Sequence, residues 1–293
     1  TTTPPTTSPT TIPTAPSPQV KIDLWGAYVG WQETALANFE SQVGKAVTHQ
    51  AVFVHWGNES GFPFYIANSL KAKGKTLVIF WEAMDYNSSV EQPRFNYDAI
   101  TRGDFDNYFH SFAAEAKSYG APVILIPFEE MTGDWSPWSG TKNGNSPAKH
   151  ITAFRYIHGF FKDIPNVKLA WNVNNESVPN TANNQIEMYY PGDQYVDYVG
   201  VDGFNFGTPE QTFDQVFSPA MVKIRKYNKP IYIFSMATHE GSGKATWITD
   251  ALNKMPSYPG MVGFIWFNEK KERDWRVWSD PSALEAFKAS LPK

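Results

Sequence analysis

The chain has no cysteine among its 293 residues, which excludes disulfide bonds, thiolate chemistry and cysteine-based zinc sites. Runs of basic residues are also absent and the net charge is −4, so we expect neither nucleic acid nor an anionic membrane as a partner. No apolar stretch approaches the ~20 residues that span a bilayer. The six histidines show no H-x-x-x-H or comparable pairing, so we expect no catalytic metal and no other cofactor.

The N-terminal segment differs in composition from the rest of the chain. Residues 1–18 are nearly all threonine, proline and serine, which cannot build a packed core and favour extended, polyproline-like conformations. At ~3.1 Å per residue this segment would span roughly 55 Å. We therefore predict a linker over residues 1–19, joined to other modules of a larger protein, and one domain over residues 20–293.

Aromatic residues are abundant: they make up 16% of the chain and include 11 tryptophans. Tryptophan buries a large area in any core. An indole ring also stacks on the apolar face of a pyranose, so a sugar-binding cleft would use the same residues. Composition leaves both interpretations open.

Short apolar runs alternate with segments of helical character along residues 20–293. Most of the apolar runs are continuous, as in parallel strands that are covered on both faces. The predicted strands are residues 22–29, 51–56, 76–81, 122–128, 167–173, 198–201, 230–234 and 261–267. The predicted helices are residues 33–43, 62–73, 104–119, 147–162, 211–227, 245–254 and 281–290, and residues 180–190 are the least clearly helical connection.

Eight strands with interleaved helices predict an α/β fold of the (β/α)8 TIM-barrel type. A doubly wound open sheet is the alternative, but no glycine-rich phosphate-binding loop follows the first strand. In a TIM barrel the functional residues stand at the C-terminal ends of the strands. Those ends carry Trp31, Trp81, Glu82, Glu129, Glu130, Trp171, Asn172, Asp202, Ser235, Phe267, Asn268 and Glu269.

The most specific stretch is PFEEMTGDWSPW, residues 127–138. Two adjacent carboxylates end an apolar strand, and a glycine turn with two tryptophans follows. Successive strand residues point to opposite sides, so Glu129 and Glu130 are not expected to face the same spot. One of them is expected to enter the cleft as an acid whose pKa is raised by the surrounding indoles.

This stretch resembles the signature R-P-L-H-E-M-N-G-x-W-x-P-W of glycoside hydrolase family 26, a group of retaining (β/α)8 enzymes. The resemblance implies that Glu130 is the general acid/base and that Trp135 stacks on sugar near the scissile bond. Three positions depart from the mannanase form of the signature: Ile126 replaces Arg, Glu129 replaces His and Thr132 replaces Asn. These departures point away from mannan as the substrate.

The resemblance extends over essentially all of residues 20–293. Residues 260–280 look like the family's strand eight and the following loop, which implies that Trp275 and Arg276 lie beside the donor subsites. Residues 195–207 look like strand six, with Phe204 where many members have a tyrosine that hydrogen-bonds the nucleophile. The full set of expected substrate-binding residues is Trp31, Trp81, Glu129, Trp135, Trp138, Phe204, Trp275 and Arg276.

Residues 229–248 are similar to the family pattern K-P-I-x-I-x-E-x-A-S-x-E-x-G-G-x-K-A-x-W-I, whose first Glu is the nucleophile. Ser235 stands at that position. A retaining glycosidase needs two carboxylates about 5–5.5 Å apart, and a serine is shorter and uncharged at neutral pH. We interpret Ser235 as a disabled nucleophile position, made either to trap a ligand or to give a glycosynthase.

Other interpretations of this region remain open. Glu240, five residues later, could itself be the nucleophile, although it matches the second, non-nucleophilic Glu of the pattern. Ser235 with nearby His239 could form a serine hydrolase, although the G-x-S-x-G elbow is missing. The domain could also be a non-catalytic carbohydrate-binding barrel that lost its nucleophile by drift.

Taken with the resemblance, these observations predict an endo-β-1,3-1,4-glucanase that acts on lichenan or barley β-glucan by a retaining mechanism, with Ser235 disabling this chain. The runner-up is an endo-β-1,4-mannanase of the same family. The expected partners are the β-glucan polysaccharide or its oligosaccharides and, through the linker, other modules. We expect a monomeric domain in a secreted, extracellular, cellulosome-like modular enzyme.

Overall fold

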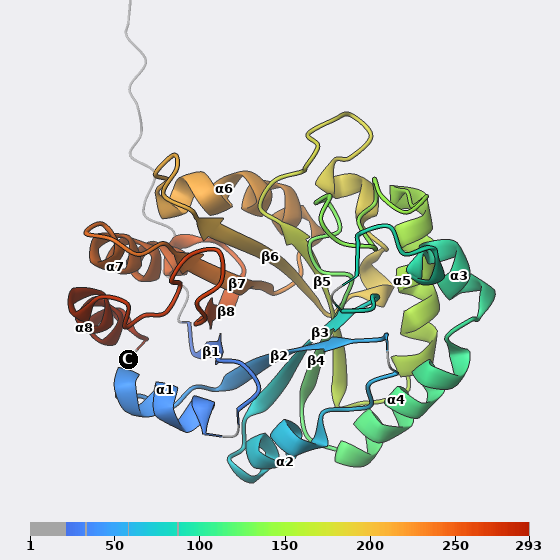
Figure 1. The fold of residues 1–293 in the computed structure, drawn as a ribbon, viewed down its shortest axis with the longest axis horizontal. Coiled ribbons are helices and arrows are strands. Elements are labelled where there is room, and N and C mark those ends of the chain that lie inside the picture. Colours follow the sequence, from blue (N-terminus) through green and yellow to red (C-terminus); the bar gives the residue numbers. More distant parts are fainter. Residues whose placement is uncertain (1–21, 33, 58, 87, 293) are drawn as a thin grey trace, which may run out of the picture.

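A computed structural model describes residues 22–32, 34–57, 59–86 and 88–292, and the predicted linker at residues 1–19 lies outside them. Eight parallel strands close into a barrel in the order β1 to β8, and Figure 1 shows helices arranged around it. The predicted (β/α)8 barrel is therefore confirmed. None of the described helices is long and apolar enough to cross a membrane.

The strands and helices alternate along the chain for most of its length. The strands are β1 (Leu24–Tyr28), β2 (His49–His55), β3 (Thr76–Glu82), β4 (Val123–Pro127), β5 (Val167–Asn174), β6 (Tyr198–Asn205), β7 (Ile231–Thr238) and β8 (Met261–Phe267). The helices are α1 (Ala35–Val43), α2 (Phe64–Ala72), α3 (Tyr97–Arg102), α4 (Asp106–Tyr119), α5 (Pro147–Phe161), α6 (Phe213–Ile224), α7 (Lys244–Lys254) and α8 (Pro281–Ser290).

Two apolar layers hold the barrel together. One fills its interior with residues from most of the strands, among them Phe80, Ile126 and Phe234. The other lies between the strands and the surrounding helices and contains most of the buried aromatic residues. The interior is filled so closely that a Cβ on Gly200 would stand 2.2 Å from the Phe234 ring, which explains a glycine inside β6.

The differences from the predicted elements concern lengths and one connection. β6 and β7 extend four residues beyond their predicted ends, so Ser235 lies inside β7 and not at its end. The short helix α3 was not predicted. Between β5 and β6 the chain forms only 3₁₀ turns at Ile186–Tyr189 and Asp193–Tyr195, in agreement with the weak helical pattern there.

Candidate active site

A cavity of about 580 Å³ opens at the C-terminal ends of the strands, where the sequence places the polar residues. Most of the predicted site residues meet in it. Those that line this cavity are Glu129, Glu130, Trp135, Trp138, Phe204, Ser235 and Trp275. Carboxylates and aromatic rings therefore share one pocket, and an aromatic lining with a few polar groups is typical of small-molecule binding sites.

Both adjacent glutamates line this cavity, so the prediction that they face opposite sides is wrong. The reason is that β4 ends at Pro127, before either of them. Phe128 and Glu130 then take the left-handed backbone conformation, with φ of 61° and 54°. This conformation is uncommon for non-glycine residues and is often found at functional sites. The alternation of a strand no longer applies to residues in such a turn.

Glu130 stands half-buried in the wall of the cavity with one aromatic hydrogen-bond donor. The indole Nε1 of Trp135 donates to its Oε2 at 2.8 Å, and that indole is 43% exposed. Burial raises the pKa of Glu130, while the Trp135 hydrogen bond and the nearby charge of Lys271 lower it to a smaller extent. The net raised pKa favours a protonated carboxyl that can donate a proton to a ligand oxygen.

Ser235 reaches the cavity because of an irregularity in β7. Phe234 points into the barrel interior, so simple alternation would turn Ser235 away from it. In the pairing of β6 with β7, Val201 stands opposite Ile233 and Asp202 opposite Ser235, and Phe234 is skipped. Such a bulge lets two consecutive side chains face the same side of a strand. Ser235 consequently lines the cavity beside the carboxylate of Asp202.

Asp202 is a buried carboxyl between the two predicted catalytic positions. Its Oδ2 accepts a hydrogen bond from Asn172 Nδ2 at 2.6 Å, and its Oδ1 has no partner among the described residues. Burial and the nearby charge of Glu130 raise its pKa well above the ordinary value. The raised pKa favours a neutral Asp202, which would reduce charge repulsion with a carboxylate introduced at position 235.

A buried chain of hydrogen bonds holds the backbone of the segment that carries Glu129 and Glu130. Trp138 Nε1 donates to the backbone oxygen of Glu129 at 2.6 Å. Tyr97, the first residue of α3, donates from its hydroxyl to the backbone oxygen of Trp138 and contacts His150 Nδ1 at 2.8 Å. Burial lowers the pKa of His150 to about 3, which keeps the ring neutral. Trp138 thus lines the cavity mainly as support for the glutamate segment.

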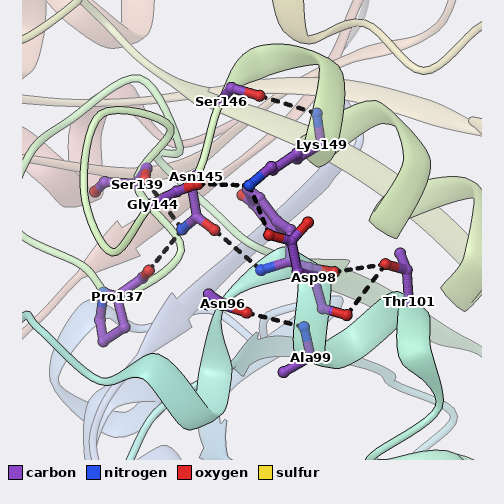
Figure 2. Close-up of polar contacts among 11 residues, drawn as sticks. Asn96, Asp98, Ala99, Thr101, Pro137, Ser139, Gly144, Asn145, Ser146 and Lys149 are labelled. Atoms are coloured by element: carbon purple, nitrogen blue, oxygen red, sulfur yellow. Dashed lines mark hydrogen bonds and ion pairs between the residues drawn. The ribbon is translucent and has the colours of Figure 1, made fainter.

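Asn145 joins the same loop to α3, as Figure 2 shows. Its Nδ2 donates to the backbone oxygen of Pro137 at 2.8 Å and its Oδ1 accepts from the backbone N–H of Tyr97 at 2.9 Å. Nearby, Lys149 Nζ contacts Asp98 Oδ2 at 2.6 Å. Asn145 satisfies backbone groups on two segments at once, whereas Lys149 and Asp98 form a partly exposed ion pair.

Replacing Asn145 with alanine is expected to destabilise the protein by about 1–3 kcal/mol, because it leaves partly buried backbone groups without partners. The control is Lys149→Gln, which breaks an ion pair worth at most about 1 kcal/mol. Thermal melting of the two variants and the parent measures the difference. Equal melting temperatures for Asn145→Ala and the parent would contradict this role for Asn145.

The remaining predicted site residues lie elsewhere. Trp31 is 44% exposed and lines a second cavity of about 760 Å³. Trp81 is fully buried under the helices, where its Nε1 donates to Tyr108 Oη at 3.0 Å, so its prediction as a sugar-binding residue is wrong. Its position in β3 turns it outward from the barrel. Arg276 lines neither cavity, and Asp274 binds its guanidinium at 2.8 and 2.6 Å.

Several residues that line the first cavity were not predicted as catalytic or substrate-binding, among them Glu82, Phe206, Lys271 and Glu272. Glu82 ends β3, and Phe206 follows β6, where its 44% exposed ring packs edge-on against Trp275. Lys271 and Glu272 come from the loop after β8. The position of Glu82 at a strand end was a usable signal, whereas the loop residues carry no pattern that would show which way they point.

Neither Glu240 nor His239 lines either of the two cavities, so their positions do not support the alternative interpretations of this region. Glu240 is exposed and its Oε2 accepts the backbone N–H of Asp274 at 2.9 Å. His239 Nε2 contacts Glu210 Oε2 at 2.7 Å, and no contact joins His239 to Ser235 among the described residues. No group of three or more His, Asp or Glu side chains in the described ranges is placed to hold a metal ion.

The sequence profile described as Glycosyl hydrolase family 26 matches residues 21–279. Endoglucanase H of Acetivibrio thermocellus is 36% identical over 280 residues, which cover 91% of this chain and 30% of that protein. A mannan endo-1,4-β-mannosidase of Bacillus subtilis is 25% identical over 258 residues, 82% of this chain and 64% of that protein. The chain thus spans about a third of the length of Endoglucanase H and about two thirds of the length of the mannosidase.

Among solved structures, a β-mannanase from Bacteroides ovatus superposes with a TM-score of 0.69 at 17% identity, over 92% of this chain and 88% of that one. An endo-β-1,4-mannanase catalytic domain from Bacillus sp. JAMB-750 gives a TM-score of 0.69 at 15% identity, over 94% and 86%. At this level of identity the two likenesses establish the barrel fold alone.

Proposed function

The chain belongs to glycosyl hydrolase family 26, and from this premise we propose that it is the glycosidase domain of an endo-β-1,3-1,4-glucanase whose nucleophile position is occupied by Ser235. Glu130 is the general acid/base in this proposal. It protonates the leaving oxygen in the first step, and in the second it removes a proton from the incoming water. A glutamate at position 235 would supply the attacking carboxylate that a retaining mechanism requires.

One observation carries the proposal: Glu130 and Ser235 line the same cavity, although 105 positions separate them in the chain. The turn after β4 and the bulge in β7 bring them there. Asp202 lies near both residues: it pairs with Ser235 in the sheet, and the charge of Glu130 raises its pKa. The proposed acid and the proposed nucleophile position therefore line one pocket, which supports the assignment.

The aromatic lining supports a sugar chain as the ligand. Phe204, Phe206 and Trp275 pack against one another at ring distances of 5.1–6.2 Å along one wall. Trp135 stands beside Glu130 with its indole nitrogen already bonded, so its exposed ring face remains available for stacking on a pyranose. Stacking binds neutral sugars without a charged partner, which suits a polysaccharide substrate.

Mixed-linkage glucan is the substrate we favour over mannan. One support is the 36% identity to Endoglucanase H over 91% of this chain. The other is that Glu129 and Thr132 stand where the mannanase signature has His and Asn. Endo-β-1,4-mannanase stays the second candidate, since several relatives carry that name. A non-catalytic carbohydrate-binding barrel is the third, and Glu130, which lines the cavity with a raised pKa, argues against it.

The substrate assignment is tested with the Ser235→Glu protein on barley β-glucan, β-mannan and β-1,3-xylan. We expect kcat/KM for barley β-glucan to exceed that for mannan by at least about tenfold, which corresponds to ~1.4 kcal/mol between transition states. Reducing-sugar assays at matched polymer concentration measure it. A preference for mannan would transfer the assignment to the second candidate, and a protein that binds glucan but stays inactive would favour the third.

We further propose that the domain acts outside the cell as a monomer, with other modules attached through the Thr/Pro-rich segment. The support is the composition of residues 1–19 and the partial coverage of the longer relatives. The proposed partners are β-glucan chains, with no nucleic acid, membrane or cofactor involved. Sedimentation of the purified chain and binding to insoluble glucan are the corresponding measurements.

A further inference from the structure

Glu82 occupies the point where the two cavities meet. It is the last residue of β3 and lines both the 580 Å³ cavity around Glu130 and the 760 Å³ cavity around Trp31. It is half-buried, so part of its carboxyl remains accessible. The residues that the two cavities share are Phe53, Glu82, Met84, Phe267 and Lys271. A sugar chain that extended from one cavity to the other would pass over Glu82.

Glu82 and Glu129 line the same cavity, where their carboxyls are close enough to interact directly. Glu129 is only 6% exposed, and its Oε2 receives no hydrogen bond from any N–H or O–H group of the described residues. Two ionised carboxylates are both acceptors and repel each other. The contact is therefore a hydrogen bond only when a proton lies between the two groups.

The proton belongs mainly to Glu129. It is the more buried partner, and burial together with the charge of Glu82 raises its pKa well above the ordinary value. Burial also raises the pKa of Glu82, to about 7, while the nearby charge of Lys271 lowers it, so Glu82 is the partner that ionises and accepts the hydrogen bond. The other titratable groups that face Glu82 are Glu130 after β4 and Tyr28 of β1.

We propose that Glu82 and Glu129 act as one unit, in which protonated Glu129 donates to Glu82 and Glu82 accepts a hydrogen bond from a hydroxyl of the bound sugar chain where the two cavities meet. This inference rests on the proposed function, because it takes the ligand to be a neutral polysaccharide. Glu82 is then a substrate-binding residue and Glu129 is a positioning residue that acts through it.

The pair has a physical advantage over a single carboxylate. A lone charged Glu82 would be free to turn among its rotamers and would face the acidic Glu130 without a fixed donor. Held by Glu129, it keeps its remaining lone pairs toward the cavity, and charge-assisted hydrogen bonds to hydroxyls are about twice as strong as neutral ones. A sugar hydroxyl donates readily to such an acceptor.

Binding to the Ser235 chain tests the unit without interference from turnover. The probes are a mixed-linkage glucan tetrasaccharide and mannotetraose, measured by calorimetry between pH 5 and pH 8. The variants are Glu82→Gln and Glu129→Gln, both close in shape to the parent, and Glu285→Gln on the exposed face of α8 is the control. Thermal melting verifies that each variant is folded.

We expect Glu82→Gln to weaken tetrasaccharide binding by roughly 10- to 100-fold, the size of one hydrogen bond to a charged group. Glu129→Gln keeps an N–H donor toward Glu82 and should bind within about threefold of the parent. Burial raises the pKa of Glu82 to about 7. Parent binding should therefore strengthen as the pH rises through 7, because Glu82 ionises, and Glu82→Gln should lose this part of the pH dependence.

Equal binding and equal pH profiles for Glu82→Gln and the control would overturn the inference. If Glu129→Gln does not fold, the Glu82→Gln profile decides alone. Tighter binding of mannotetraose than of the glucan tetrasaccharide would refute the proposed substrate but leave the unit standing, provided that Glu82→Gln weakens the better ligand. Loss of pH dependence without loss of affinity would place Glu82 outside the binding surface.

Discussion

Replacing Ser235 with glutamate is expected to raise the rate of polysaccharide hydrolysis by ~10³-fold or more, because removal of a catalytic nucleophile elsewhere costs orders of magnitude while binding largely remains. The bulge in β7 already turns position 235 into the cavity that Glu130 lines. The longer side chain should therefore reach the anomeric carbon of a sugar bound in this cavity. Initial rates on barley β-glucan for the Ser235 and Ser235→Glu proteins measure the gain.

The matched control for this gain is Ser235→Gln, which has the length of glutamate but no charge. It should remain as slow as the Ser235 protein, and all three proteins should bind the tetrasaccharide with similar affinity. Comparable hydrolysis by the Ser235 and Ser235→Glu proteins would contradict the assignment. The nucleophile would then be another carboxylate of the cavity, and Asp202, which pairs with Ser235, would be the first residue to replace.

The protein with Ser235 also allows a test between the two purposes considered for a disabled nucleophile, a glycosynthase and a ligand trap. An α-laminaribiosyl fluoride imitates the covalent intermediate, since its fluorine fits below the sugar ring where the carboxylate is missing. With Glu130 as base, a glycosynthase would couple this donor to an acceptor sugar with a β linkage. A ligand trap would bind the donor and give no product.

The barrel was predictable because its strands are buried on both faces. β4, for example, is apolar at every position, and such a run bounded by helical segments leaves few alternatives to a parallel sheet. Glu130, Trp135 and Ser235 were also located in advance, since the family resemblance is strongest around them. In each case the information lies in residues that are adjacent in the chain.

What the sequence did not reveal depends on backbone geometry. Alternation gave the wrong direction for Glu129 because two residues after β4 take positive φ, and no composition signal marks them. It also fails at Ser235, where the bulge skips Phe234. Trp81 was misassigned for the converse reason: in regular β3, alternation holds and turns it outward into the helix layer. Loop residues such as Lys271 reach the cavity through contacts distant in sequence.

Replacing Glu130 with glutamine in the Ser235→Glu background is expected to reduce kcat/KM on barley β-glucan by about 10²–10⁴-fold, the usual contribution of a positioned general acid. The glutamine cannot protonate the leaving oxygen, although it can still accept the hydrogen bond of Trp135. An aryl glycoside with a good leaving group needs little protonation, so its glycosylation step should be slowed much less. Pre-steady-state release of the aryl group measures that step alone.

The pH profile gives an independent check on Glu130. Burial raises the pKa of this carboxyl, and the acid works only while it is protonated, so kcat/KM of the Ser235→Glu protein should fall as the pH rises past that pKa. Glu130→Gln should abolish this alkaline decline and leave the acidic limb, to which ionisation of the restored carboxylate and of Glu82 both contribute. Trp135→Phe is the matched control: it removes the hydrogen bond that lowers the pKa of Glu130, and should move the decline to higher pH without abolishing it. An alkaline limb unchanged in Glu130→Gln would assign the acid to another group, since no proton on Glu130 would then limit the reaction.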